Sequence, residues 1–397
     1  MKMTPADETY FSATTAKNTV LVGIFLIFAF DSLAIRDTEI LRFVLEGKLV
    51  RFSDGSQKAE LCGYLPACLR VGSAWLSVGI QNLLIELSRL IDLPADRHNP
   101  ELLSIAGKES FLFVMGEVIS RLVVLTPIFL GASMLYRSFA LRALLIISVF
   151  MTLSGWARSN PLFTEQFFVY YDFAAVGFVF LLFFLIATEK TKGFFGAAAT
   201  LVLGQLIFEN LGIVAGIAIA IYSFAGSDHS LGLSARTAMA MKRLLAMAAV
   251  SIVALGVLYL AMQIANDWEQ IEGSSFSGYF TIAWNEYGRA NFADFHDIKE
   301  NFFEIIAYPS ASGLLLGLLV IPRALSTPEA MQRFQTQFHA ALGIWIGFMC
   351  TLVIAMFLSG LYYEMGRQLI PLCVVTTLVW ATGIPVLANT IRNLKAR

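Results

Sequence analysis

Long apolar runs separated by short polar segments make up most of this chain. A helix that crosses a bilayer needs about 20 consecutive apolar residues, and most of the runs approach or reach that length. The candidate membrane spans are residues 19–35, 111–136, 138–157, 169–188, 194–224, 244–265, 303–322, 338–359 and 368–390. The pattern therefore predicts an all-α polytopic membrane protein.

The run from Phe194 to Phe224 does not fit a single span. It is longer than one crossing needs and shorter than two full crossings need, and Glu209 and Asn210 lie in its middle. Polar residues at a break in an apolar helix occur where the break faces a cavity or the membrane interface. The run is therefore predicted to be a broken helix or a hairpin, which gives about 10 transmembrane helices.

The positions of lysine and arginine favour an even number of crossings. Short cytoplasmic loops carry an excess of these residues. With an even number and the N-terminus inside, fourteen bases fall in short inside segments and four in short outside segments, namely Arg158, Arg289, Lys299 and Arg367. The outer loop 36–110 holds nine more, but loops longer than ~60 residues do not follow this rule. The fourteen are Lys2, Lys17, Arg137, Arg142, Lys190, Lys192, Arg236, Lys242, Arg243, Arg323, Arg333, Arg392, Lys395 and Arg397. The N- and C-termini are therefore expected in the cytoplasm, with the protein in a bacterial inner membrane.

The chain is expected to form a single integral membrane domain over residues 1–397, with two larger outer segments. In the first outer loop, 36–110, residues 37–52 and 73–92 each place apolar side chains on one helical face. Both patterns are typical of amphipathic helices that lie in the membrane interface. The second segment, 266–302, is acidic and aromatic, and fits either a solvated cap or a binding surface.

The pair Cys62 and Cys68 lies between the two amphipathic patterns. The spacing would allow a small disulfide in an oxidising compartment, and two free thiols are the equal alternative.

Composition supports the membrane class and limits the kinds of partner that the protein could bind. The chain is 57% hydrophobic and 14% charged, with a mean hydropathy of +0.70, which excludes an ordinary soluble domain. The net charge of −1 gives no sign of a nucleic-acid partner. The sequence has no glycine-rich nucleotide motif and no cysteine–histidine zinc spacing, so neither a cofactor nor a metal site is predicted.

Acids at the end of the first run are the first candidates for chemistry. Asp31 lies in the last turn of that run, and an acid within a span is a functional candidate because its burial in lipid is costly. Asp37 and Glu39 follow directly. These two could cap the first amphipathic helix, since Asp satisfies free N–H groups at a helix start, or they could be catalytic.

Further polar residues lie at the same predicted outer face. They are Asp172 at the start of a span, Glu209 and Asn210 at the break, and Tyr363, Glu364 and Arg367 before the last span. The Arg367 guanidinium could pair with Glu364 or hold a phosphate, for which its planar shape is suited. Clustering on one side suits an enzyme that uses a lipid-linked substrate, whereas transporters place polar residues near the midplane.

This arrangement resembles the GT-C superfamily of polyprenyl-phosphate-sugar glycosyltransferases. The resemblance rests on a first span that ends near Asp31, an outer loop that starts RDTE and carries two interfacial helices, and many later spans. It implies that an acid just after the first span is the catalytic base, a position that Asp37 matches best, with Asp31 and Glu39 beside it. Asp172 is also similar in position to the family's second outer acid. The family's usual paired acids are replaced here by D-x-E.

The implied reaction transfers a sugar from a lipid-linked sugar donor to a glycan or lipid acceptor. A carboxylate would take the proton of the acceptor hydroxyl, and Arg367 would stabilise the departing lipid phosphate. A divalent metal could assist that departure, although no ligand set is legible.

Two alternatives remain at this level. A polysaccharide polymerase or ligase would use the outer arginines, and a transporter or lipid-linked-sugar flippase would use the break at Glu209 and the Glu117–Arg121 pair of the second span.

Overall fold

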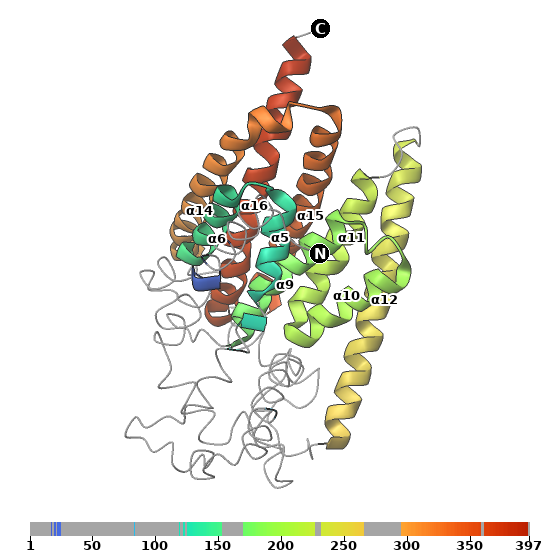
Figure 1. The fold of residues 1–397 in the computed structure, drawn as a ribbon. Helices are drawn as coiled ribbons and strands as arrows, with labels where there is room; N and C mark the ends of the chain where they lie inside the picture. Colours follow the sequence, from blue (N-terminus) through green and yellow to red (C-terminus); the bar gives the residue numbers. More distant parts are fainter. Residues whose placement is uncertain are drawn as a thin grey trace, which may run out of the picture.

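The computed structural model describes residues 125–152, 170–226, 232–265, 295–358 and 361–395, with a few isolated positions before residue 124. Every regular element in these ranges is an α-helix (Figure 1). The helices are α5 (Pro127–Leu135), α6 (Phe139–Met151), α9 (Tyr170–Ala187), α10 (Phe194–Ile207), α11 (Glu209–Ala225), α12 (Leu233–Ala265), α14 (Phe295–Ala324), α15 (Pro328–Leu358) and α16 (Leu361–Lys395). The predicted all-α class is confirmed for this part of the chain.

Three of the described helices are long and apolar enough to cross a membrane. Their apolar windows are Leu233–Leu258 in α12, Pro328–Val353 in α15 and Ile370–Lys395 in α16. Five more described helices are apolar but shorter, and they are Phe139–Met151, Ala174–Ala187, Phe194–Ile207, Asn210–Ala225 and Pro309–Ala324. The protein therefore has the apolar helices of a membrane protein.

The run 194–224 is a helical hairpin. Phe208, with φ −160° and ψ 127°, is the only residue between α10 and α11, and its N–H donates to the Gly204 carbonyl. The two helices fold back on each other, since Gly216 of α11 lies against Leu201 of α10 and Gly212 lies against Gln205. The predicted break is confirmed, two residues before Asn210.

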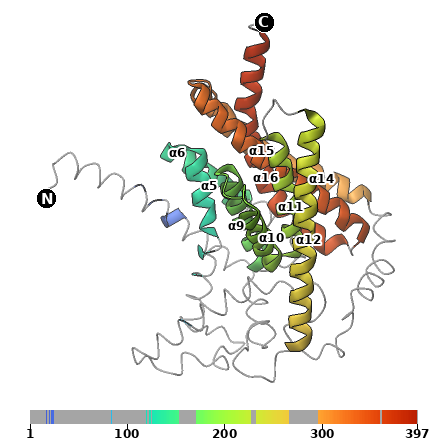
Figure 2. The same cartoon turned by 90° about the vertical axis from the view of Figure 1, so that its right-hand side faces the viewer.

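The helices differ in how much neighbouring protein covers them. The α16 window is 67% buried, and its residues between Ile370 and Ala381 pack on nearly all sides. The α12 window is only 6% buried, and the helix stands along the outer surface of the bundle (Figures 1 and 2). Its exposed side chains are large and apolar, including Leu245, Ile252 and Val257. In a membrane such a surface faces lipid.

Glycines in α14 and α15 allow two close helix contacts. A Cβ on Gly313 would lie 2.6 Å from the Thr377 carbonyl oxygen of α16, and one on Gly347 would lie 2.9 Å from the Val214 carbonyl oxygen of α11. Each glycine has a second one four residues away, at 317 and 343, that is equally close to the facing helix. Small residues at this spacing are typical of membrane helix interfaces.

The contacts fix the direction of each helix. Gly343 lies against Ala218 and Gly347 against Val214, so α11 and α15 are antiparallel. The facing pairs Trp345–Thr376 and Phe338–Gly383 make α15 and α16 antiparallel as well.

The starts of α12 and α15 are tied to neighbouring helix ends. Arg243 of α12 donates to the Thr191 and Lys192 carbonyls between α9 and α10, and to the Ser223 hydroxyl near the end of α11. At the other side of the bundle, the Arg333 and Gln337 side chains of α15 donate to the Met134 carbonyl of α5.

These directions give the bundle a basic end and an opposite end. The basic end, uppermost in Figure 1, contains the α5–α6, α9–α10 and α14–α15 connections, the start of α12 and the end of α16. Eleven described bases lie there with two acids, Glu189 and Glu329. The bases are Arg137, Arg142, Lys190, Lys192, Arg236, Lys242, Arg243, Arg323, Arg333, Arg392 and Lys395. All eleven are among the fourteen that the even number of crossings assigns to one side.

Several predicted boundaries differ from the structure, and others lie outside the described residues. The helices predicted at 338–359 and 368–390 are longer, at Pro328–Leu358 and Leu361–Lys395. The helix predicted to begin at 244 begins at Leu233, because the preceding alanines, methionines and basic residues favour helix. Residues 295–302, predicted as loop, form the first two turns of α14. The loop 36–110, with both amphipathic helices and the cysteine pair, lies outside the described residues apart from Leu83.

Candidate functional site

The three acids proposed to include the catalytic base cannot be placed in the bundle. Asp31, Asp37 and Glu39 all lie outside the described residues. Their proposed role therefore continues to rest on the sequence.

The backbone positions of the later candidates gather at one end of the bundle. Asp172 is in the first turn of α9, Glu209 is the first residue of α11, and Glu364 is in the first turn of α16. All three helices run from the opposite end toward the basic end, so these positions lie at the opposite end, together with 363 and 367. Only the backbone of these residues is described, so their side-chain contacts are not discussed.

The charges at the opposite end are mainly acidic. The described helices contribute six acids there against two bases, Lys299 and Arg367. The acids are Asp172, Glu209, Asp297, Glu300, Glu304 and Glu364. The bundle is therefore polarised, with bases at one end and acids at the other.

The turn of the hairpin is lined by polar groups within an apolar surround. Asn210 is half-buried at the start of α11. One helical turn before the break, the buried Gln205 side chain donates to the Ser251 hydroxyl of α12. Its Oε1 atom is buried and accepts no hydrogen bond within the described structure. The pair joins α10 to α12, and a structural role explains it.

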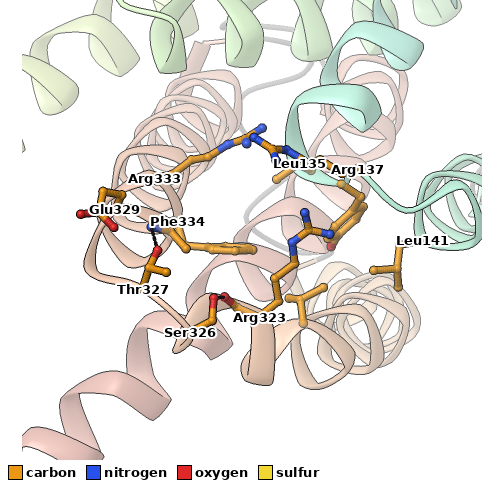
Figure 3. Close-up of a pocket in the computed structure, with 12 residues that line it drawn as sticks. Leu135, Arg137, Leu141, Arg323, Ser326, Thr327, Glu329, Arg333 and Phe334 are labelled. Carbon is orange, nitrogen blue, oxygen red and sulfur yellow. Dashed lines mark hydrogen bonds between the residues drawn. The ribbon is translucent and has the colours of Figure 1, made fainter.

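A pocket of about 330 Å³ opens at the basic end, between the α5–α6 connection and the α14–α15 connection (Figure 3). Three arginines line it: Arg137 after α5, Arg323 at the end of α14 and Arg333 in the second turn of α15. Figure 3 shows their guanidinium groups converging on the same opening. Glu329 is the one acid among the residues that line this pocket.

The walls of the pocket combine hydroxyl and apolar groups. Ser326, Thr327 and the buried Tyr136 carry hydroxyls, and Leu135, Leu141, Val320 and Phe334 contribute apolar surface. The Thr327 hydroxyl accepts from the Ala330 N–H at 3.1 Å and so caps α15. The arrangement is suited to a ligand with an anionic head and an apolar neighbour.

No motif in the sequence marks this pocket. In the sequence its arginines indicate only the orientation of the chain, and Arg137 lies nearly 200 residues before Arg333. The sequence feature that could have indicated the pocket is the short polar connection after each apolar run. Two such connections on one side of a membrane can lie next to each other and form a pocket. In the described part of the chain, no group of three or more His, Cys, Asp or Glu side chains could hold a metal ion.

Comparisons with protein-family models, with curated protein sequences and with solved structures find no match.

Proposed function

We propose that the protein is a polytopic membrane glycosyltransferase with about 10 transmembrane helices. It transfers a hexose or pentose from a polyprenyl-phosphate donor to a glycan or lipid acceptor at the outer face. The observation that carries the proposal is the polarised bundle, in which the starts of α9, α11 and α16 bring the candidate acids to the end opposite the bases. One-sided clustering suits chemistry on a lipid-linked substrate at one leaflet.

The orientation of the bundle follows from its charges. Cytoplasmic segments of membrane proteins carry the excess of lysine and arginine, and eleven described bases lie at the basic end. We therefore assign the basic end and both termini to the cytoplasm of a bacterial inner membrane. The acidic end then meets the outer leaflet, where a polyprenyl-linked sugar would be used.

In this proposal the roles follow the GT-C resemblance. Asp37 accepts the proton of the acceptor hydroxyl, with Asp31 and Glu39 near it and Asp172 as the second outer acid. Arg367 holds the lipid phosphate that leaves the anomeric carbon. Displacement by a single base in one step inverts that carbon.

The hairpin favours one other function. Helices broken near the middle of a membrane occur in transporters, and the break at Phe208 places Glu209 at a turn. A flippase for lipid-linked sugars would use such a turn. A polysaccharide polymerase or ligase, the remaining alternative, would depend on outer arginines such as Arg367.

Reconstitution separates these functions. We expect the purified protein in proteoliposomes to transfer sugar from a panel of polyprenyl-phosphate hexoses and pentoses, with release of polyprenyl phosphate. Movement of intact lipid-linked sugar across the bilayer, lost in Glu209→Gln, would instead establish a flippase. Extension of a glycan on a polyprenyl diphosphate without use of the monophosphate donors would establish a polymerase.

Cysteine labelling tests the orientation. In a variant whose four native cysteines are replaced, we expect an impermeant maleimide to label Ser274→Cys in intact cells. Lys395→Cys, at the end of α16, should react only after the membrane is opened. Labelling of Lys395→Cys in intact cells would place the basic end outside and would contradict the proposal.

A further inference from the structure

The pocket at the basic end is separate from the proposed sugar-transfer chemistry, which lies at the other end of the bundle. It joins two connections that are distant in sequence, at residues 136–138 and 325–327 (Figure 3). Nothing in the sugar-transfer proposal uses it. Its charge and its hydroxyls point to a ligand of their own.

The arginines of the pocket have no acidic partner in the described part of the chain. Within the described ranges, no ion pair joins Arg137, Arg323 or Arg333 to a carboxylate, although Glu329 shares the pocket wall. Arg333 uses one nitrogen to donate to the Met134 carbonyl, which leaves further guanidinium N–H groups for a ligand. Three like charges around one cavity repel each other, so an anion between them would be stabilising.

A buried hydroxyl gives a second, independent sign of a ligand. Tyr136 lines the pocket and is only 2% exposed. Its phenolic oxygen has no hydrogen-bond partner in the described structure. A buried hydroxyl without a partner is energetically unfavourable, and native proteins keep such groups where a ligand or water completes them. A phenol can donate directly to a phosphate oxygen.

The start of α15 adds to the positive field of the pocket. Thr327, Glu329 and Ala330, which cap or form its first turn, are part of the pocket wall. A helix N-terminus carries a partial positive charge and favours anions. The three arginines, Tyr136 and the start of α15 thus border the same pocket.

The position and walls of the pocket favour the phosphate of a lipid over free phosphate. The pocket lies where the apolar helices α5 and α14 end and α6 and α15 begin, a level at which lipid headgroups would lie in a membrane. Leu135, Leu141, Val320 and Phe334 give it an apolar side, which free phosphate would not need. Basic pockets between membrane helices are a known mode of anionic headgroup binding.

We propose that this pocket binds the phosphate of an anionic membrane lipid. Arg137, Arg323 and Arg333 pair with the phosphate oxygens, the Tyr136 hydroxyl donates to one of them, and the start of the lipid tails lies on the apolar side. The bound lipid joins the α5–α6 connection to the α14–α15 connection. The volume of about 330 Å³ is at the lower limit of small-molecule sites and suits a compact headgroup such as phosphoglycerol.

The test measures thermal stability of the full-length protein in detergent with added lipid. We expect phosphatidylglycerol to raise the melting temperature by roughly 2–4 °C, and phosphatidylcholine or inorganic phosphate to raise it much less. Arg323→Gln and Arg137→Gln should each weaken phosphatidylglycerol binding about tenfold or more, since each removes a charged hydrogen-bond donor. Native mass spectrometry of the same samples should show fewer retained anionic lipids.

Two control variants separate a binding site from general charge. Arg392→Gln removes an exposed arginine at the same end but outside the pocket, so its lipid response should equal that of the wild type. Tyr136→Phe removes no protein hydrogen bond, so its melting temperature without lipid should not fall, while its gain from phosphatidylglycerol should shrink. An equal response in Arg323→Gln and Arg392→Gln, or a full response to inorganic phosphate, would overturn the proposal.

Discussion

Replacement of Asp37 by asparagine is expected to abolish sugar transfer while the protein still inserts and folds. Asparagine has nearly the shape of aspartate but cannot accept the proton of the attacking hydroxyl. A positioned general base contributes about 10²–10⁴-fold to a rate, so transfer should fall by at least about 100-fold. The measurement is release of polyprenyl phosphate in proteoliposomes, with expression and melting temperature recorded for the same preparation.

Asp297→Asn is the matched control for this experiment. Asp297 lies in the first turn of α14, at the same end of the bundle, and is outside the proposed site. The control makes the same change of charge and should leave transfer within about twofold of wild type, in the range of ordinary surface substitutions. Full activity in Asp37→Asn, in Asp31→Asn and in the double variant would remove the proposed base.

Gly313→Val is expected to prevent stable packing of α14 against α16. A Cβ at this position would lie 2.6 Å from the Thr377 carbonyl oxygen and 2.8 Å from the Trp380 Cβ. The first of these atoms belongs to the backbone and cannot rotate away, so the two helices must separate. Overpacking of a close contact destabilises by about 1–3 kcal/mol or more, and we expect the upper part of that range. Fluorescence-detected size-exclusion chromatography after a heating series measures the loss.

Gly256→Val gives the control with the same atoms added. Gly256 lies in α12, and no atom outside its own helix turn lies within 4 Å of the position its Cβ would take. Valine is the slightly better helix former, so stability should stay constant or rise slightly. Similar losses in both variants would show that the sensitivity comes from membrane insertion and not from the α14–α16 contact.

The apolar pattern predicted the helices well where one run made one helix. The run 169–188 corresponds to α9, and the break in 194–224 falls at Phe208, directly before the polar pair Glu209 and Asn210 that signalled it. Both predictions depend on local features, namely run length and an acid in an apolar stretch. The total of about 10 crossings stays a prediction, because three described helices have full spanning length and the ranges 1–118 and 266–294 are largely undescribed.

Features that depend on contacts between distant segments could not be predicted in this way. The glycine pair 313 and 317 is visible in the sequence, but its partner helix α16 is not, since the facing residues lie more than 60 positions away. The arginine pocket is likewise formed by segments that are distant in the sequence. Charge counting assigned its arginines to one side of the membrane without indicating that two connections would bring three of them together.

The hydrogen bonds that hold the α10–α11 hairpin have a consequence for membrane insertion. With 14 and 17 residues, its arms rise about 21 and 26 Å, which is at or below the lower limit for a membrane-spanning helix. Their ends are held by Arg236, which donates to the Phe224 carbonyl at 2.9 Å, and by Arg243, and both residues belong to the next helix. The ribosome therefore releases the two helices of the hairpin before the two arginines that hold their ends. A chain truncated before Arg236 lacks both of these donors, so we expect it to be proteolysed faster than a chain that extends through α12.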